Sequence, residues 1–124
     1  MMDQKYKILC IGDSKSVHAF LRECVKPISA DFQSAFDGEQ GIGVLTQNPK
    51  AFDIIFLDWE MPKKDGPTTY MEMKTLGVSC PVFMLTSKNA TDDIAKMLDA
   101  GVTEYILKPF TQDIIIDKVK QFVG

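Results

Sequence analysis

Residues Phe52–Leu57 read F-D-I-I-F-L, an apolar run that only Asp53 interrupts. A run of this kind is typical of a strand in a parallel sheet that helices cover on both faces. Asp58, Trp59 and Glu60 follow directly, so a polar loop begins where the strand ends. The run therefore predicts a central strand with carboxylates at its carboxyl end.

On both sides of this run, short apolar segments alternate with segments of helical spacing. Further strands are predicted at Lys7–Ile11, Asp31–Phe36, Pro81–Leu85 and Tyr105–Leu107. Helices are predicted from Ser14 or Ser16 to Pro27, at Glu39–Gln47, from Asp65 to Gly77, around Ile94–Leu98 with Gly101 as its cap, and from Thr111 onward. Five β-α units predict an α/β fold: a doubly wound, five-stranded parallel sheet in the order 2-1-3-4-5 with five helices.

Length and composition indicate one small globular domain. The 124 residues are 45% hydrophobic and 25% charged, with a net charge of −3, so we expect a single domain over residues 1–124 without an output domain. No basic run exceeds Lys63-Lys64, which argues against nucleic acid as a partner. The N-terminus lacks a signal-peptide core, no apolar run is long enough to span a membrane, and the three cysteines lack metal-site spacing. A cytoplasmic protein with reduced cysteines, and no membrane partner, is predicted.

Polar side chains follow the predicted strands at one edge of the sheet. Asp13 follows the first strand, Asp58 the third, Thr86 the fourth and Lys108 the fifth. In this strand order the crevice between the carboxyl ends of strands 1 and 3 is the expected ligand site. A carboxylate nucleophile, a second carboxylate for a hard cation, a hydroxyl and an ammonium suit phosphoryl transfer to an aspartate.

Three motifs strengthen this interpretation. The chain carries L-D-W-E-M-P-x-x-D-G at Leu57–Gly66, M-L-T-S at Met84–Ser87 and Y-I-L-K-P-F at Tyr105–Phe110. With these motifs it resembles the receiver domain of two-component response regulators, most closely the free-standing CheY-like type with its flavodoxin-like fold. The resemblance extends from Lys7 to Phe122.

The resemblance implies a phosphoacceptor and a metal. Asp58 would accept the phosphoryl group. Mg²⁺ would be held by Asp13, by Asp58 and by the backbone carbonyl of Glu60. The domain would be a signalling module rather than an enzyme with a separate substrate, although it would assist its own phosphorylation and dephosphorylation.

The resemblance also implies a switch. Lys108 would pair with the phosphoryl group, after a Lys108-Pro109 peptide that is usually cis in this family. The Thr86 hydroxyl would move to meet the phosphoryl group. Tyr105 matches the aromatic residue whose ring turns inward when the threonine shifts. Trp59 is expected to shape the rim of the site because it lies beside Asp58 in the sequence.

Partners follow from the same resemblance. A histidine kinase or a histidine phosphotransfer protein would be the phosphodonor, docking near the first helix and the site. A downstream protein would bind the surface formed by the fourth helix, fifth strand and fifth helix, at about Asp92–Phe122.

The chain departs from the family pattern at one acid. Gly12 stands where receivers usually carry the first of two adjacent acids, so we expect weaker Mg²⁺ binding. The Glu60 side chain could face a metal-bound water, be a solvated loop residue or pair with Lys88. His18 is expected to be partly exposed and without a role.

Three other interpretations stay open at this point. A degenerate receiver would dock partners without taking phosphate, and Gly12 is the feature that favours it. A haloacid-dehalogenase-type phosphohydrolase would need D-x-D-x-[TV], whereas this chain has D-W-E-M-P at Asp58–Pro62. A flavin-binding protein would need a better phosphate loop than G-D-S-K-S at Gly12–Ser16.

Overall fold

The computed structural model describes residues 5–123. These residues form a parallel sheet in the order β2-β1-β3-β4-β5, as predicted. The strands are β1 (Tyr6–Ile11), β2 (Ser29–Ala35), β3 (Ile54–Asp58), β4 (Val82–Thr86) and β5 (Glu104–Leu107). The helices are α1 (Lys15–Val25), the short 3₁₀ helix η1 (Lys26–Ile28), α2 (Gly38–Gln47), α3 (Gly66–Thr75), α4 (Thr91–Ala100) and α5 (Gln112–Val123).

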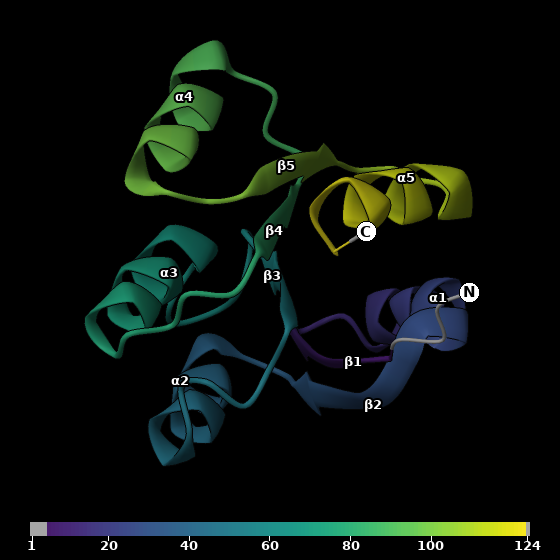
Figure 1. Ribbon diagram of the computed structural model, residues 1–124. Helices are drawn as coiled ribbons and strands as arrows, with labels where there is room; N and C mark the ends of the chain where they lie inside the picture. The colour runs from purple at the N-terminus through teal and green to yellow at the C-terminus, as the bar shows by residue number, and fades with distance from the viewer. Residues whose placement is uncertain (1–4, 124) are drawn as a thin grey trace.

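The sheet is covered on both faces, as the apolar central strands require. Helices α1 and α5 lie on one face, and α2, α3 and α4 lie on the other (Figure 1). Alternate residues of β3 supply the two cores: Ile55 and Leu57 pack toward α2–α4, whereas Ile54 and Phe56 pack toward α1 and α5. All four side chains have no exposed surface.

Helix boundaries follow the capping residues. Ser14, Asp37 and Asp65 accept hydrogen bonds from backbone N–H groups in the first turns of α1, α2 and α3, and this satisfies donors that a helix N-terminus leaves unpaired. Gly101 ends α4 with a φ of 114°, a left-handed conformation that favours glycine. Strand β2 begins at Ser29 rather than Asp31, directly after η1, which contains Pro27.

Gly41 of α2 has a packing reason that outweighs its low helix propensity. A Cβ atom at Gly41 would lie 2.6 Å from Cδ1 of Ile11 in β1. Glycine at this position lets the helix approach the sheet closely, so its low helix propensity is offset by packing.

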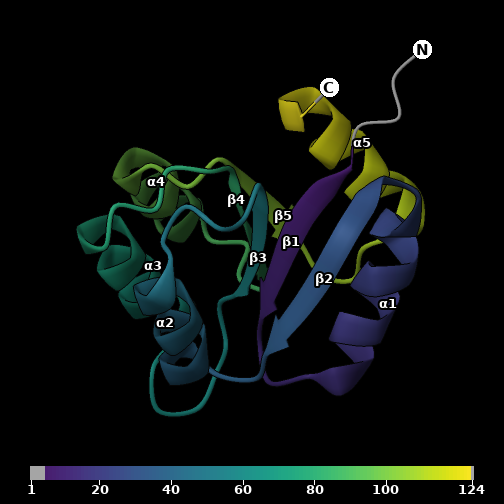
Figure 2. The same cartoon turned by 60° about the horizontal axis from the view of Figure 1, so that its bottom comes forward.

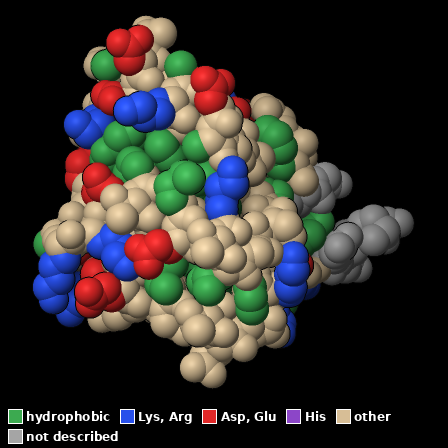
Figure 3. Space-filling model, turned by 90° about the vertical axis from the view of Figure 1, so that its left-hand side faces the viewer, with side chains coloured by type: hydrophobic (Ala, Val, Ile, Leu, Met, Phe, Trp, Pro, Cys, Tyr) green, Lys and Arg blue, Asp and Glu red, His purple; other side chains and the backbone are tan. Residues whose placement is uncertain are grey.

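Two features of the described residues bear on membranes and on surface charge. None of the helices there has the length and apolarity that crossing a bilayer requires. On the face shown in Figure 3, acidic and basic side chains are interspersed, and no basic stripe runs among the side chains drawn there.

Candidate functional site

The site lies at the carboxyl edge of the sheet, where the parallel strands end side by side (Figure 2). Asp58 and Thr86 are the last residues of β3 and β4, and Lys108 directly follows β5. In the register of the sheet, Asp58 pairs with Leu85, and Thr86 pairs with Leu107. The topology therefore brings together side chains from three strands that are far apart in the sequence.

Asp58 and Lys108 form a short ion pair at the centre of the site. The Lys108 Nζ atom donates to Oδ1 of Asp58 at 2.7 Å. The Asp58 side chain is 4% exposed, and the Lys108 side chain is 27% exposed. The carboxylate is thus nearly buried, with one cation beside it and access from the solvent side.

Burial raises the pKa of Asp58 above its ordinary value of 3.8. The hydrogen bond and the positive charge of Lys108 oppose this rise, whereas the negative charges of Glu60 and Asp13 add to it. The ionised Asp58 carboxylate is therefore less stable than it would be in water. A further cation or an electrophile bound beside it would stabilise it, and carboxylates in this state are common at functional sites.

The Glu60 side chain is 40% exposed, as expected of a solvated loop residue, yet its carboxylate also makes two contacts within the site. Its Oε2 atom accepts a hydrogen bond from the Thr86 hydroxyl at 2.6 Å, and its Oε1 atom is 3.8 Å from Nζ of Lys108. The expected alternative of a pair with Lys88 is wrong, because the Lys88 ammonium instead lies over the Trp59 ring, 5.8 Å from its centroid.

Tyr105 is turned toward the interior. The residue is 8% exposed, and its ring meets Trp59 edge-on, with the ring centroids 6.2 Å apart. The Tyr105 hydroxyl donates to the backbone carbonyl of Lys88 at 2.7 Å, and the N–H of Lys88 donates to the Thr86 hydroxyl at 3.0 Å. One peptide loop therefore connects Thr86 to Tyr105. The Lys108-Pro109 peptide bond is cis, as expected.

The end of β1 is held by a residue that the sequence analysis misjudged. His18 is 3% exposed rather than partly exposed. Its Nε2 atom is 2.7 Å from the carbonyl oxygen of Gly12, so it donates there, and Nδ1 lies 2.8 Å from the Ser34 hydroxyl. His18, Leu21 and Val25 share one buried stripe of α1 at spacings of i, i+3 and i+7. This helical spacing is the sequence pattern that could have predicted the burial of His18.

A second unforeseen residue, Gly66, supports the loop after Asp58. Its N–H donates to the carbonyl of Trp59 at 2.8 Å. A Cβ atom at this position would lie 2.6 Å from the Asp58 carbonyl oxygen and 2.7 Å from Cα of Trp59. Since any larger residue would collide with this backbone, glycine is needed where α3 begins against the loop.

The residues predicted to hold Mg²⁺ form an all-oxygen set. Asp13 is exposed at the end of β1, close enough for its charge to act on Asp58. Within residues 5–123, no group of three or more His, Cys, Asp and Glu residues is arranged to hold a metal. Mg²⁺ commonly uses only one or two carboxylates and keeps several waters. Two carboxylates and the Glu60 carbonyl therefore fit this ion in kind.

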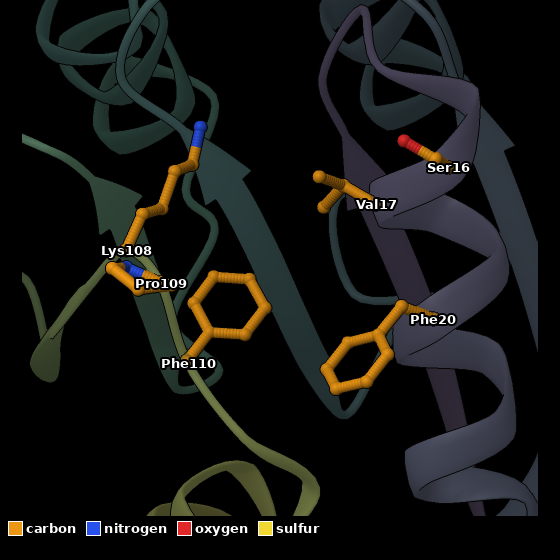
Figure 4. A pocket seen from close by; sticks show the side chains of 6 residues that line it. All are labelled: Ser16, Val17, Phe20, Lys108, Pro109 and Phe110. Atoms are coloured by element: carbon orange, nitrogen blue, oxygen red, sulfur yellow. The ribbon is translucent and has the colours of Figure 1, made fainter.

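A pocket of about 310 Å³ lies beside the site. It is lined by Ser16, Val17 and Phe20 of α1 and by Lys108, Pro109 and Phe110 after β5. Figure 4 shows Phe20 and Phe110 on opposite walls, with the Lys108 side chain extending away from them. The pocket thus forms an apolar hollow between α1 and the segment after β5, with Lys108 among its lining residues.

Comparison with known proteins gives a consistent result. Residues 8–120 match the family of the response regulator receiver domain. The chain is 32% identical over 120 residues to the sensor histidine kinase CheAY of Helicobacter pylori, covering 95% of this chain. It is 31% identical over 119 residues to protein PilG of Pseudomonas aeruginosa, covering 94% of this chain and 87% of PilG. A two-component response regulator from Clostridium difficile superposes with a TM-score of 0.85 at 29% identity, covering 96% of each chain.

Several of these relatives are longer proteins. The chain spans 15% of CheAY and 50% of the transcriptional regulatory proteins RprY of Bacteroides fragilis and DltR of Streptococcus agalactiae. The similarity thus concerns their receiver portion.

Proposed function

The chain belongs to the response regulator receiver domain family, and from that premise we propose that it accepts a phosphoryl group on Asp58 and signals through a protein-binding surface. The observation that carries the proposal is the buried Asp58 carboxylate with Lys108 Nζ at 2.7 Å. Membership in this family leaves the phosphohydrolase and flavin-binding alternatives without support.

The proposed reaction is transfer from a phosphohistidine to the aspartate. One oxygen of Asp58 attacks phosphorus, a P–O bond forms, the P–N bond to the donor imidazole breaks, and the imidazole leaves with its electron pair and takes up a proton. Lys108 and the Thr86 hydroxyl stabilise the negative charge on the phosphoryl oxygens. Attack of water on the acyl phosphate later returns the free carboxylate and inorganic phosphate.

We propose Mg²⁺ as the cofactor, held by Asp13, Asp58 and the backbone carbonyl of Glu60. The ion would neutralise charge on the phosphoryl oxygens and on the two carboxylates. Gly12 contributes no side chain, so the metal charge is balanced by fewer acids, and we expect its affinity to be correspondingly low.

The phosphodonor would be a histidine kinase or a histidine phosphotransfer protein that docks on α1 and the pocket beside Lys108. The apolar walls of the pocket, Val17, Phe20 and Phe110, suit such a contact. The receiver itself would be cytoplasmic, and its output would be a protein that binds α4, β5 and α5. This surface exposes the large apolar side chains Leu98, Leu107, Ile114 and Phe122.

Intact mass spectrometry tests the central assignment. After incubation with a small phosphodonor and Mg²⁺, the protein should gain roughly 80 dalton, the mass of one phosphoryl group. Asp58→Asn should abolish the adduct, whereas Asp53→Asn, a matched change at an exposed aspartate near the other end of β3, should not. Absence of any adduct on the native chain would instead favour the degenerate receiver, and an adduct on Asp58→Asn would contradict the assignment.

A further inference from the structure

The carboxylate of Glu60 contacts both side chains that we assign to the phosphoryl group. Its Oε2 atom accepts from the Thr86 hydroxyl at 2.6 Å, and its Oε1 atom lies 3.8 Å from the Lys108 ammonium. Glu60 thus places an anion between a hydroxyl and a cation, the same pairing that a phosphoryl group on Asp58 would require.

The Thr86 hydroxyl has a single proton to donate. Thr86 has no exposed surface, and its proton goes to Glu60, while its oxygen accepts the N–H of Lys88 at 3.0 Å. The hydroxyl cannot donate to a phosphoryl oxygen and to Glu60 at once. Phosphorylation must therefore displace Glu60 from Thr86.

The contacts of Thr86 continue to Tyr105. The peptide loop at Lys88 donates its N–H to Thr86 and accepts the Tyr105 hydroxyl at its carbonyl, at 2.7 Å. The Tyr105 ring is buried against Trp59. The inward position of Tyr105 is thus connected, through two hydrogen bonds and one residue, to the bond between Thr86 and Glu60.

We propose that the Glu60 carboxylate is an internal stand-in for the phosphoryl group, which holds Thr86 and Tyr105 inward before any phosphate is bound. The proposal rests on the proposed function, because it takes Thr86 and Tyr105 as the elements that respond to phosphate. Phosphorylation then exchanges one anion for another. The conformational gain from phosphate is correspondingly small, and Glu60 is a positioning residue.

Two variants separate the effect of the length of the Glu60 side chain from the effect of its charge. Glu60→Ala removes the carboxylate, and Glu60→Asp keeps its charge but shortens the side chain by one methylene group, so that it falls short of Thr86. Both variants should release Tyr105 toward solvent in the unmodified protein. Glu72→Ala is the matched control, since Glu72 is a partly exposed glutamate in α3 that pairs with Lys64 outside the site.

Fluorine NMR of the unmodified protein tests this. 3-Fluorotyrosine would be incorporated at the three tyrosines, and Tyr105→Phe would assign the signal. The shift of the Tyr105 resonance between H₂O and D₂O reports its exposure. We expect a small shift in the native protein and in Glu72→Ala, and a shift at least twofold larger in Glu60→Ala and Glu60→Asp.

Beryllofluoride with Mg²⁺, a phosphoryl analogue, supplies the second arm. It should return the Tyr105 signal of Glu60→Ala to the native value, which a purely structural lesion would not allow. An exposed Tyr105 in the native protein, no change in Glu60→Ala, release in Glu60→Ala without release in Glu60→Asp, or no recovery with beryllofluoride would each overturn the proposal. Because the first arm uses no phosphate, its outcome is independent of whether the mass measurement finds Asp58 phosphorylated.

Discussion

The two sides of the crevice around Asp58 are built in different ways. On the side of β4 and β5, Lys108 and Thr86 are engaged by the carboxylates of Asp58 and Glu60 through side-chain contacts. On the side of β1, Gly12 has no side chain, Asp13 is exposed, and the loop is held through its backbone by His18. The β4–β5 side is thus a network of polar side chains, whereas on the β1 side a buried histidine fixes the position of the backbone.

This difference separates two tasks. A network of side chains with alternative partners can rearrange when a new anion arrives, because its hydrogen bonds can be exchanged one for another. A backbone carbonyl held by a buried ring is less free to move. Under the proposed function, the β4–β5 side would sense the phosphoryl group, whereas the β1 side would offer a fixed position for one acid and a metal.

The largest effect is expected on the sensing side. Lys108→Ala should slow formation of the phosphoryl adduct at Asp58 by about 10²-fold, because loss of one positioned donor to a developing anion typically costs that much. The time course of intact mass with a small phosphodonor measures this. Lys88→Ala is the control, since it also removes an ammonium at the rim but one that lies over Trp59. If both variants slow adduct formation equally, Lys108 acts only through its positive charge near the site and not through a specific contact.

On the clamped side, His18→Leu should lower the free energy of unfolding by about 1–3 kcal/mol, the cost of leaving a buried polar partner unsatisfied. The carbonyl of Gly12 and the Ser34 hydroxyl both lose their contact with the ring. Chemical denaturation measures the loss. The control is Lys15→Leu, an exposed position of α1, for which we expect little change. A native-like stability of His18→Leu would show that the β1 loop needs no clamp.

Gly12→Asp tests whether the β1 side can regain the missing acid. A Cβ atom there would lie 3.0 Å from Cβ and 3.3 Å from Oδ2 of Asp58, so the new carboxylate is crowded against an existing one. Without Mg²⁺ we expect a loss of about 1 kcal/mol from crowding, and with Mg²⁺ a larger rise in Tm than the native protein shows.

Gly12→Ala is the matched control for this change, because it adds the same Cβ without a charge. It should lose stability from crowding but gain nothing extra from Mg²⁺. If Gly12→Asp and Gly12→Ala respond equally to Mg²⁺, the added acid does not reach the metal.

The smallest effect is a pH dependence of stability at Asp58. Its pKa is raised in the folded protein above the value of 3.8, so the folded state binds more protons than the unfolded state between the two pKa values. Stability contributed by this group is therefore present below pH 3.8 and is lost as the pH rises through the folded pKa. Asp58→Asn should accordingly raise Tm by a few °C at neutral pH, with no such gain near pH 3.

Thermal unfolding of the native chain and Asp58→Asn across this pH range measures the difference. Asp53→Asn serves as the control. A gain for Asp58→Asn that is independent of pH would indicate that packing, and not ionisation, is responsible.

Much of the fold could be predicted from residue patterns. The apolar run Phe52–Leu57 and the alternation around it predicted the sheet order and the layers, because burial on both faces demands apolar side chains at every strand position. The capping residues Ser14 and Asp65 marked helix starts for a local reason, since their partners lie three residues away.

Side-chain partners across the crevice could not be predicted in this way. Glu60 and Thr86 are 26 residues apart, and their contact depends on the relative position of two loops and on one rotamer. His18 was misjudged because assigning its face of α1 required the helical phase to be known within one residue, and the exposed Phe20 is as apolar as the buried Leu21.

The amino-acid sequence by itself determined which chemistry stands at which strand end, because a parallel sheet brings the residues after its strands to one edge whatever the details of packing. That rule alone predicted that Asp58, Lys108 and Thr86 lie together at the site. Only the tertiary structure decided which atoms touch: the proton of Thr86 goes to Glu60, and the ring of His18 holds Gly12. A hydrogen bond requires placement to within tenths of an ångström, and that placement arises from the packing of the whole domain.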